Sequence, residues 1–596
     1  MSNPSRASSP TRTSIVARLR PEIAGLVAGT ICLVATNALA LAIPWLIKSA
    51  IDALRAGTAG ARTAGNVHAA VVRDAALIAA LAAGQAVIRT FSRIFIFNAG
   101  RNIEYRLRGD LFRHLLRLDP GFYRRHPTGD VMSRLTNDLG AVRQLFGPGL
   151  LNLINTALVY LTTVWLLLHL SPRLTLWALL PYPFLLAAAR LSSRRIYHWS
   201  RAIQEQLGVM SASIQEDLAG VAVIKHYTLE PVRDAKFRGL NDAYLDRALS
   251  LVRVRGTLSP LFAVMGGAGT LIVLWAGGQE VIAGRLTVGG LVAFNAYLVL
   301  LSWPTIALAW IIGIWQRGIA GWARVRALLD TAPRIESQPL AAGGAATALG
   351  SPSIEVRDLT IEVDGRRLLD GVSFSLPAGG TLAIVGPTGA GKTTLVDALV
   401  RMQDVAPGRI FVGGRDITDI PLAALRGQIG YAPQDAFLFS ATVAENIGFV
   451  PTERARIEAA AEAAGLVPDL AVLPDGYDTL VGERGLTLSG GQRQRVALAR
   501  ALAADPRILI LDDSLSSVDA QTEREILTRL EPILAGRTSV LISHRLAAVR
   551  DADLVLVLDR GRVAESGTHA SLMAAGGLYA TLYRTEQAAE ALEGAA

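Results

Sequence analysis

Long uncharged apolar runs fill the first half of the chain, and only short ones occur in the second half. The first run, Ile23–Ile47, is long enough at about 1.5 Å per residue to cross a bilayer core of about 30 Å. Five further stretches predict spans of the same kind. They are Ala75–Ile88, Leu145–Leu170, Leu174–Ala189, Leu258–Gly277 and Leu291–Trp315.

Charged and polar residues in and near these spans restrict where the spans can lie and which kind of transporter they can form. Arg89 and Arg93 follow the second span, and a charge at mid-bilayer costs about 2.5–3.5 kcal/mol. We therefore expect both arginines near the interface, in a water-filled cavity, or in helix that has left the lipid. No Asp or Glu lies centrally in a span, which argues against a proton-driven pump. Amides that could line a cavity, or more commonly bond between helices, are Asn37, Gln85, Asn152, Asn155 and Asn295.

Arginine placement orients the spans. The segments 89–143 and 190–255 are long and rich in Arg, so we expect them in the cytoplasm, with both termini on the same side of the plasma (inner) membrane. Both segments read as helices that reverse near their midpoints. The reversals fall at Phe122–Asp130 and His226–Glu230, either as tips that dock on another domain or as plain solvated loops.

Composition agrees with a membrane protein. Of 596 residues 51% are apolar, and the mean hydropathy is +0.36, which is unusual for a soluble enzyme. The net charge of +9 could indicate nucleic-acid binding, but arginines flanking apolar spans give the same balance. The single cysteine, Cys32, excludes a disulfide or zinc framework, and the N-terminus shows no removable signal peptide.

After a linker rich in Ala, Gly, Pro and Ser at 332–353, short apolar strands alternate with helical segments, as in an α/β domain. One predicted strand, Leu382–Val385, leads into the spacing G-x-x-x-x-G-K-T. Glycines let a loop turn its N–H groups inward around a phosphate, and the next helix adds its positive N-terminus. Lys392 would reach the β- and γ-phosphates, and Thr393 would bind Mg²⁺. The alternative is a glycine-rich turn that binds nothing. The loop comprises Gly386, Pro387, Thr388, Gly389, Ala390, Gly391, Lys392, Thr393 and Thr394.

Carboxylates follow a second predicted strand, Ile508–Leu511. Asp512 and Asp513 would lie beside the phosphate loop, because ligands of open α/β sheets bind at the carboxyl ends of the strands. We expect Asp512 to hold Mg²⁺ through water and Asp513 to reach the attacking water, unless both only cap the next segment. His544 ends another strand.

A second glycine-rich helix start occurs at Leu488–Gln492 and could bind an anion. The chain has one phosphate loop, so this turn would meet a nucleotide held by another subunit. Its candidate contacts are Ser489, Gly490, Gly491 and Gln492.

This ordered set of motifs resembles the nucleotide-binding domain of ATP-binding cassette (ABC) transporters, and the first half is similar to the six-helix membrane domain of ABC exporters. The resemblance implies an all-α six-helix transmembrane domain followed by an α/β P-loop NTPase domain. It also implies a head-to-tail dimer that encloses two ATP, with coupling helices near the two predicted tips. Gln434 would sense Mg²⁺ and the membrane domain, and His544 would sense the γ-phosphate. The remaining motifs are Val481–Gly485, before the signature, and Ser517–Asp519, the D-loop.

Two departures from the family pattern stand out. Asp513 occupies a position that is usually Glu, and Val363 occupies one that is usually aromatic and stacks on adenine. The pattern looks like one partner of a heterodimeric multidrug exporter with a degenerate ATP site.

The expected protein partner is a second half-transporter, which is favoured over a second copy of this chain. Membrane lipid and a small amphipathic substrate are the other expected partners, and nucleic acid is not expected. An importer of the same architecture, or a soluble ABC ATPase acting on nucleic acid, is the alternative. The expected divisions are 1–22, 23–330, 331–353, 354–585 and 586–596.

Overall fold

The computed structural model describes residues 19–58, 64–335, 350–449, 452–482, 485, 487–543 and 549–593. The chain separates into two compact units. The first comprises residues 1–116 and 128–331, and the second comprises 117–127 and 332–596.

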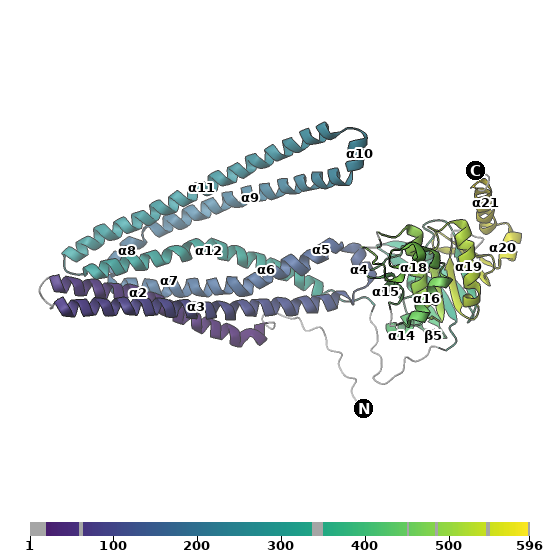
Figure 1. The fold of residues 1–596 in the computed structure, drawn as a ribbon, viewed down its shortest axis with the longest axis horizontal. Helices are drawn as coiled ribbons and strands as arrows, with labels where there is room; N and C mark the ends of the chain where they lie inside the picture. The colour runs from purple at the N-terminus through teal and green to yellow at the C-terminus, as the bar shows by residue number, and fades with distance from the viewer. Residues whose placement is uncertain are drawn as a thin grey trace, which may run out of the picture. The chain divides into compact units, whose positions relative to one another are not determined.

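All secondary-structure elements in the described part of the first unit are helices, joined by short turns (Figure 1). Two π-helical turns, Arg134–Asp138 and Leu145–Gly149, interrupt its third long segment, and a 3₁₀ turn, Arg20–Glu22, precedes the first helix. The helices are α2 (Ile23–Thr58), α3 (Ala64–Leu115), α5 (Thr128–Ser133), α6 (Leu139–Gln144), α7 (Leu150–Leu170), α8 (Pro172–Leu179), α9 (Pro181–Ala219), α10 (Val221–His226), α11 (Glu230–Ile282) and α12 (Val288–Leu329).

Within the described residues, four helical segments are long and apolar enough to cross a membrane: Arg20–Gly57, Gly65–Leu115, Thr128–Leu170 and Val288–Leu329. They carry the first, second, third and sixth predicted spans. The fourth and fifth predicted spans lie within α8–α9 and α11, which are helical as expected. The total of six spans stays a prediction.

Helices α2 and α3 pack against each other along much of their length, and small residues allow the approach. A Cβ added at Gly29 would lie 2.6 Å from Ile96 Cγ1, and one at Gly57 would lie 2.6 Å from Val67 Cγ2. Side chains near the start of α2 therefore meet the second half of α3, and the end of α2 meets the start of α3. The two helices form an antiparallel hairpin.

Helix α12 supplies much of the core of this unit. Phe294, Tyr297 and Leu301 are fully buried, and the Tyr297 hydroxyl donates to the Leu41 carbonyl of α2 at 2.8 Å. Farther along α12, the Arg324 guanidinium donates two hydrogen bonds to the Asp138 carboxylate, at 2.8 and 2.5 Å. These polar contacts fix α12 against α2 and against the segment that precedes α7.

The two predicted cytoplasmic reversals are formed by short helices. Helix α10 joins α9 to α11, which run side by side (Figure 1). Thr228 after α10 has φ +53°, and the Leu229 N–H donates to the Ile224 carbonyl at 2.9 Å. The other reversal contains α4 (Pro120–Arg125), which Asp119 caps by accepting from the Phe122 N–H.

The second unit is built on a six-stranded sheet in the order β10-β9-β3-β8-β7-β6. All neighbours are parallel except β10, which pairs antiparallel with β9 at the edge. A four-stranded antiparallel sheet, β2-β1-β4-β5, lies beside it. The strands are β1 (Ile354–Val363), β2 (Arg366–Leu376), β3 (Thr381–Val385), β4 (Ile410–Val412), β5 (Arg415–Asp416), β6 (Ile429–Ala432), β7 (Ile508–Asp512), β8 (Thr538–Ile542), β9 (Leu554–Asp559) and β10 (Arg562–Gly567).

Alternate residues of the central strands enter two separate cores. Leu382 and Ile384 of β3 belong to one apolar cluster, whereas Ala383 and Val385 belong to the other. Helices cover both faces, as expected for strands that are apolar at every position. The helices are α13 (Lys392–Leu399), α14 (Leu422–Arg426), α15 (Val443–Ile447), α16 (Arg454–Ala463), α17 (Val467–Val472), α18 (Gly490–Ala503), α19 (Ala520–Leu534), α20 (His569–Ala575) and α21 (Leu578–Glu593).

Two details differ from the divisions expected from the sequence. Residues 117–127, which were placed with the membrane domain, cluster with the second unit. Helix α21 continues to Glu593, past the expected domain end at 585, and its residue Tyr579 is fully buried.

Candidate functional site

The phosphate loop connects β3 to α13, and its glycines adopt conformations that a side chain would obstruct. Gly386 has φ +149°, and a Cβ there would collide with the Leu558 carbonyl oxygen. Gly391 has φ +101°, and a Cβ there would lie 2.8 Å from the Leu368 carbonyl oxygen. The loop is therefore fixed in shape by its neighbours and leads directly into the N-terminus of α13, which favours an anion.

Lys392, the first residue of α13, lies over this loop. Its Nζ donates to the carbonyl oxygens of Gly386 at 2.8 Å and Pro387 at 3.0 Å. The side chain is mostly buried, and this burial lowers the pKa of Lys392, while Asp513 and Asp512 act in the opposite direction. The ammonium group is thus fixed on the loop, where a phosphate would meet it.

Asp512 ends β7 and is 1% exposed. Its Oδ1 lies 3.5 Å from the Thr393 hydroxyl, which donates to it, while its Oδ2 is buried without a hydrogen-bond partner among the described residues. Burial raises the pKa of Asp512 to about 6. An unsatisfied carboxylate oxygen next to a threonine hydroxyl suits a hard divalent cation such as Mg²⁺. Two of the three residues expected at the metal, Thr393 and Asp512, therefore lie together.

Asp513 follows in a left-handed conformation, φ +46°, and is 8% exposed. Its N–H donates to the Ile542 carbonyl at 2.9 Å, and its Oδ2 accepts from Gln434 Nε2 at 3.4 Å. The structure therefore brings two of the three expected catalytic side chains together. The third, His544, lies outside the described residues.

The signature turn is held by its own helix. The Ser489 hydroxyl accepts from the Gln492 N–H at 3.2 Å, and the Gln492 side chain accepts from the Ser489 N–H at 2.9 Å, which forms a capping box. A Cβ at Gly491 would lie 3.0 Å from the Ser517 carbonyl oxygen, and one at Gly490 3.4 Å from the Ser517 Cβ. The signature glycines thus meet the D-loop rather than the neighbours of the phosphate loop.

Gln494 is a functional candidate that the sequence did not indicate. It is 5% exposed, and its Nε2 donates to the Ser516 hydroxyl at 3.0 Å and to the Gln434 carbonyl at 3.4 Å. Its Oε1 accepts from the Ser517 N–H at 2.8 Å. One buried amide therefore joins the signature helix, the D-loop and the segment that carries Gln434. In an arginine-rich helix it is indistinguishable by pattern from a solvated residue.

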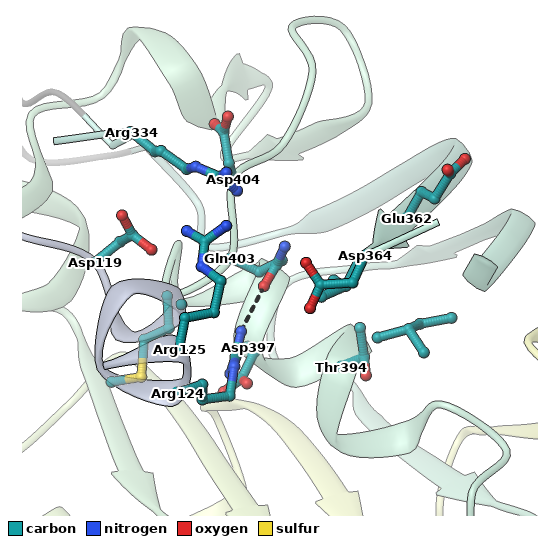
Figure 2. A pocket seen from close by; sticks show the side chains of 14 residues that line it. Asp119, Arg124, Arg125, Arg334, Glu362, Asp364, Thr394, Asp397, Gln403 and Asp404 are labelled. Carbon is teal, nitrogen blue, oxygen red and sulfur yellow. Dashed lines mark hydrogen bonds between the residues drawn. The ribbon is translucent and has the colours of Figure 1, made fainter. Parts of the chain in front are cut away.

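A cavity of about 480 Å³ opens beside the phosphate loop (Figure 2). Val363, Thr394 and Arg124 are among its lining residues. Arg124 of α4 donates to the Gln403 side chain at 3.2 Å, shown by the dashed line in Figure 2. Burial raises the pKa of nearby Asp397, and the charge of Arg124 partly offsets this effect. The expected adenine position, Val363, and the tip helix α4 therefore border one space.

Comparisons with known proteins agree with this geometry. The ABC transporter transmembrane region model matches residues 26–305, and the ABC transporter model matches 369–516. The probable multidrug resistance ABC transporter ATP-binding/permease protein YheI of Bacillus subtilis is 36% identical over 575 residues, covering 95% of this chain and 96% of the relative. An ATP-dependent lipid A-core flippase of Syntrophus aciditrophicus is 31% identical over 95% of this chain and 93% of its own length.

A solved structure of a bacterial Atm1-family ABC exporter with ATP bound is 30% identical. It superposes with a TM-score of 0.77 over 95% of this chain and 99% of its own. The helical first unit and the nucleotide-binding second unit thus match an exporter over nearly the whole chain. The chain belongs to the ABC transporter family, as an exporter-type half-transporter whose membrane domain is fused to the ATPase that drives transport.

Proposed function

We propose that this chain is one half of a heterodimer that exports a lipophilic or amphipathic molecule across the inner membrane. Both termini and the nucleotide-binding unit lie in the cytoplasm, and the chain's own phosphate loop contributes the weaker of two ATP sites. The main support for a heterodimer with one weak site is the identity of residue 513. It is Asp, shorter than the usual Glu, and it follows the end of β7 and accepts a hydrogen bond from Gln434.

The contacts of the two anion-binding turns support a dimer. The phosphate-loop glycines meet Leu368 and Leu558, whereas the signature glycines meet Ser517. The described glycines of the two turns have no neighbour in common. A complete nucleotide site would therefore combine the phosphate loop of one subunit with the signature turn of the other.

Each residue then has a defined task toward ATP. The N–H groups of the phosphate loop and the Lys392 ammonium bind the phosphates. Thr393, Asp512 and Gln434 would hold Mg²⁺, which would neutralise negative charge on the phosphates. Asp513 orients the attacking water, and Gln434, which donates a hydrogen bond to Asp513, senses Mg²⁺. A carboxylate one methylene shorter than Glu withdraws by about 1 Å, and a misplacement of this size can cost about 10²-fold in rate. Val363 offers no ring for adenine to stack on, so nucleotide is held less tightly.

Purification of the chain alone and together with the product of a neighbouring half-transporter gene tests the proposal. We expect slow ATP hydrolysis by the chain alone, and fast hydrolysis with ATP-dependent accumulation of cargo in inside-out vesicles by the pair. Full turnover by the chain alone would contradict the proposed heterodimer. ATP-driven loss of cargo from inside-out vesicles would show that the transporter imports its cargo.

A further inference from the structure

A cavity of about 260 Å³ with mixed polar and apolar walls lies within the helical first unit, between α2, α3, α7 and α12. Four helices of this unit thus surround a space that the nucleotide-binding site does not explain. Its polar lining combines guanidinium, amide and hydroxyl groups, and its other walls are apolar. The polar side chains are Thr36, Asn37, Gln85, Arg89, Ser92, Arg93, Asn152 and Asn155.

The cavity lies deep in the predicted membrane layer. Asn37, Asn155 and Trp303 all line it, and each is close to the middle of its predicted span, on α2, α7 and α12. Three independent helices therefore give the same depth, near the bilayer centre.

The α2–α3 register brings the arginines to this depth. A Cβ at Gly84 of α3 would lie 3.9 Å from Leu39 of α2, and one at Gly29 of α2 would lie 2.6 Å from Ile96 of α3. Arg89 falls between these two contact points and hence at the level of the middle of the first span. It cannot have left the lipid region, so of the three placements open to the arginines the water-filled cavity fits.

The positive charge in this cavity has no counter-ion among the described residues of this chain. None of the lining residues is Asp or Glu, and neither Arg89 nor Arg93 has an ion pair with any residue that the structure describes. An uncompensated guanidinium at this depth is costly and indicates a functional site. Ser92, between them, is fully buried, and its hydroxyl lacks a hydrogen-bond partner among the described residues. A buried hydroxyl of this kind needs an acceptor or donor from outside the chain.

We propose that this cavity binds the anionic headgroup of an amphiphile, with Arg89 and Arg93 as its counter-ions. A phosphate or carboxylate would accept from both guanidinium groups, which lie one helical turn apart on α3. The volume is below the roughly 300–1,000 Å³ of sites that enclose a drug-sized ligand, so it holds a headgroup while the apolar part extends along Leu33, Leu151 and Trp303. This inference rests on the proposed export function and specifies its cargo as acidic.

Binding of dye-labelled lipids to the purified full-length chain in detergent tests the site. Phosphatidylglycerol is the anionic probe, and phosphatidylcholine with the same acyl chains is the zwitterionic one. We expect tighter binding of phosphatidylglycerol, and a loss of at least about tenfold in its affinity for Arg89→Gln/Arg93→Gln, since each charge-assisted hydrogen bond contributes this much or more. Affinity for phosphatidylcholine stays the same.

Two matched variants control for charge and folding. Arg101→Gln removes an exposed arginine of the same helix that does not line the cavity, and we expect wild-type binding. Arg89→Lys/Arg93→Lys keeps the charge and retains most of the selectivity, which identifies charge rather than packing as the cause even if the glutamine pair folds poorly.

The outcomes separate the site from the wider function. Equal binding of both lipids by the wild type, or unchanged phosphatidylglycerol binding by the glutamine pair, overturns the site while ATP-driven export can still be observed. Competition by glycerol 3-phosphate as strong as by the lipid would show a site for a soluble anion and overturn the amphiphile. Arginine-dependent lipid binding without ATP-driven transport would leave the site standing and remove the export function.

Discussion

At the scale of single residues, the end of β7 shows how much of the site follows from strand order alone. Asp512 and Thr393 are 119 positions apart, yet their expected proximity is confirmed at 3.5 Å, because β7 and β3 both end at the edge where ligands of parallel sheets bind. Gln494 was not predictable, because its role depends on contacts between its helix, the D-loop and the Gln434 segment that only the tertiary fold brings together.

Replacing Asp513 by Glu should raise ATP hydrolysis at this chain's own site at least about tenfold, measured in a reconstituted pair whose other site is disabled, because the longer side chain restores about 1 Å of reach toward the attacking water. The substitution has a backbone cost, since Asp513 has φ +46° and Asp tolerates this region better than Glu. A melting curve beside the ATPase assay separates the two effects. An unchanged rate in a pair whose partner has an intact signature would contradict the role given to Asp513.

At the scale of elements, the sequence predicted helices and strands well where the apolar pattern was strong. The strands expected at Leu382–Val385 and Ile508–Leu511 are observed as β3 and β7, and the two long arginine-rich segments are helical. The apolar periodicity of the sequence could not predict that residues 117–127 associate with the second unit. A short helix has too few turns for its periodicity to show what it packs against. The burial of Phe122 and the hydrogen bond from Arg124 to Gln403 are tertiary contacts, which the sequence pattern does not predict.

Helix α4 offers a test of coupling between transport and hydrolysis. Asp119→Ala removes the cap of α4, which costs about 1 kcal/mol in helix stability. We expect cargo-stimulated hydrolysis to fall while basal hydrolysis remains, because the phosphate loop itself is untouched. Hydrogen exchange over residues 120–126 should rise in parallel. Asp119→Asn is the matched control, since Asn caps as well as Asp and differs only in charge. Identical behaviour of the two variants would assign the effect to charge in the neighbouring cavity.

At the scale of the whole molecule, each unit has its own folded core, but neither unit contains all the groups that its proposed function needs. The second unit holds a phosphate loop and a signature turn with different neighbours, and the first holds arginines with no described counter-ion. The sequence could predict the first deficiency, because it contains one loop and one signature. The sequence could not decide among three placements of Arg89 and Arg93. The depth of Arg89 follows from the packing of α2 on α3 and not from hydropathy.

The division of labour between two different subunits predicts unequal effects of two substitutions in this chain. Gly491→Asp places a charge and a side chain where an added Cβ would lie only 3.0 Å from the Ser517 carbonyl oxygen, so it disables the signature turn that would complete the partner's active site. We expect ATP turnover of the pair to fall at least about tenfold, whereas Lys392→Ala, which affects only the weak site, leaves turnover within about threefold while reducing nucleotide binding. The mirrored substitutions in the partner are the control and should show the opposite order. Equal losses from all four variants would indicate two equivalent sites, as in a dimer of identical chains.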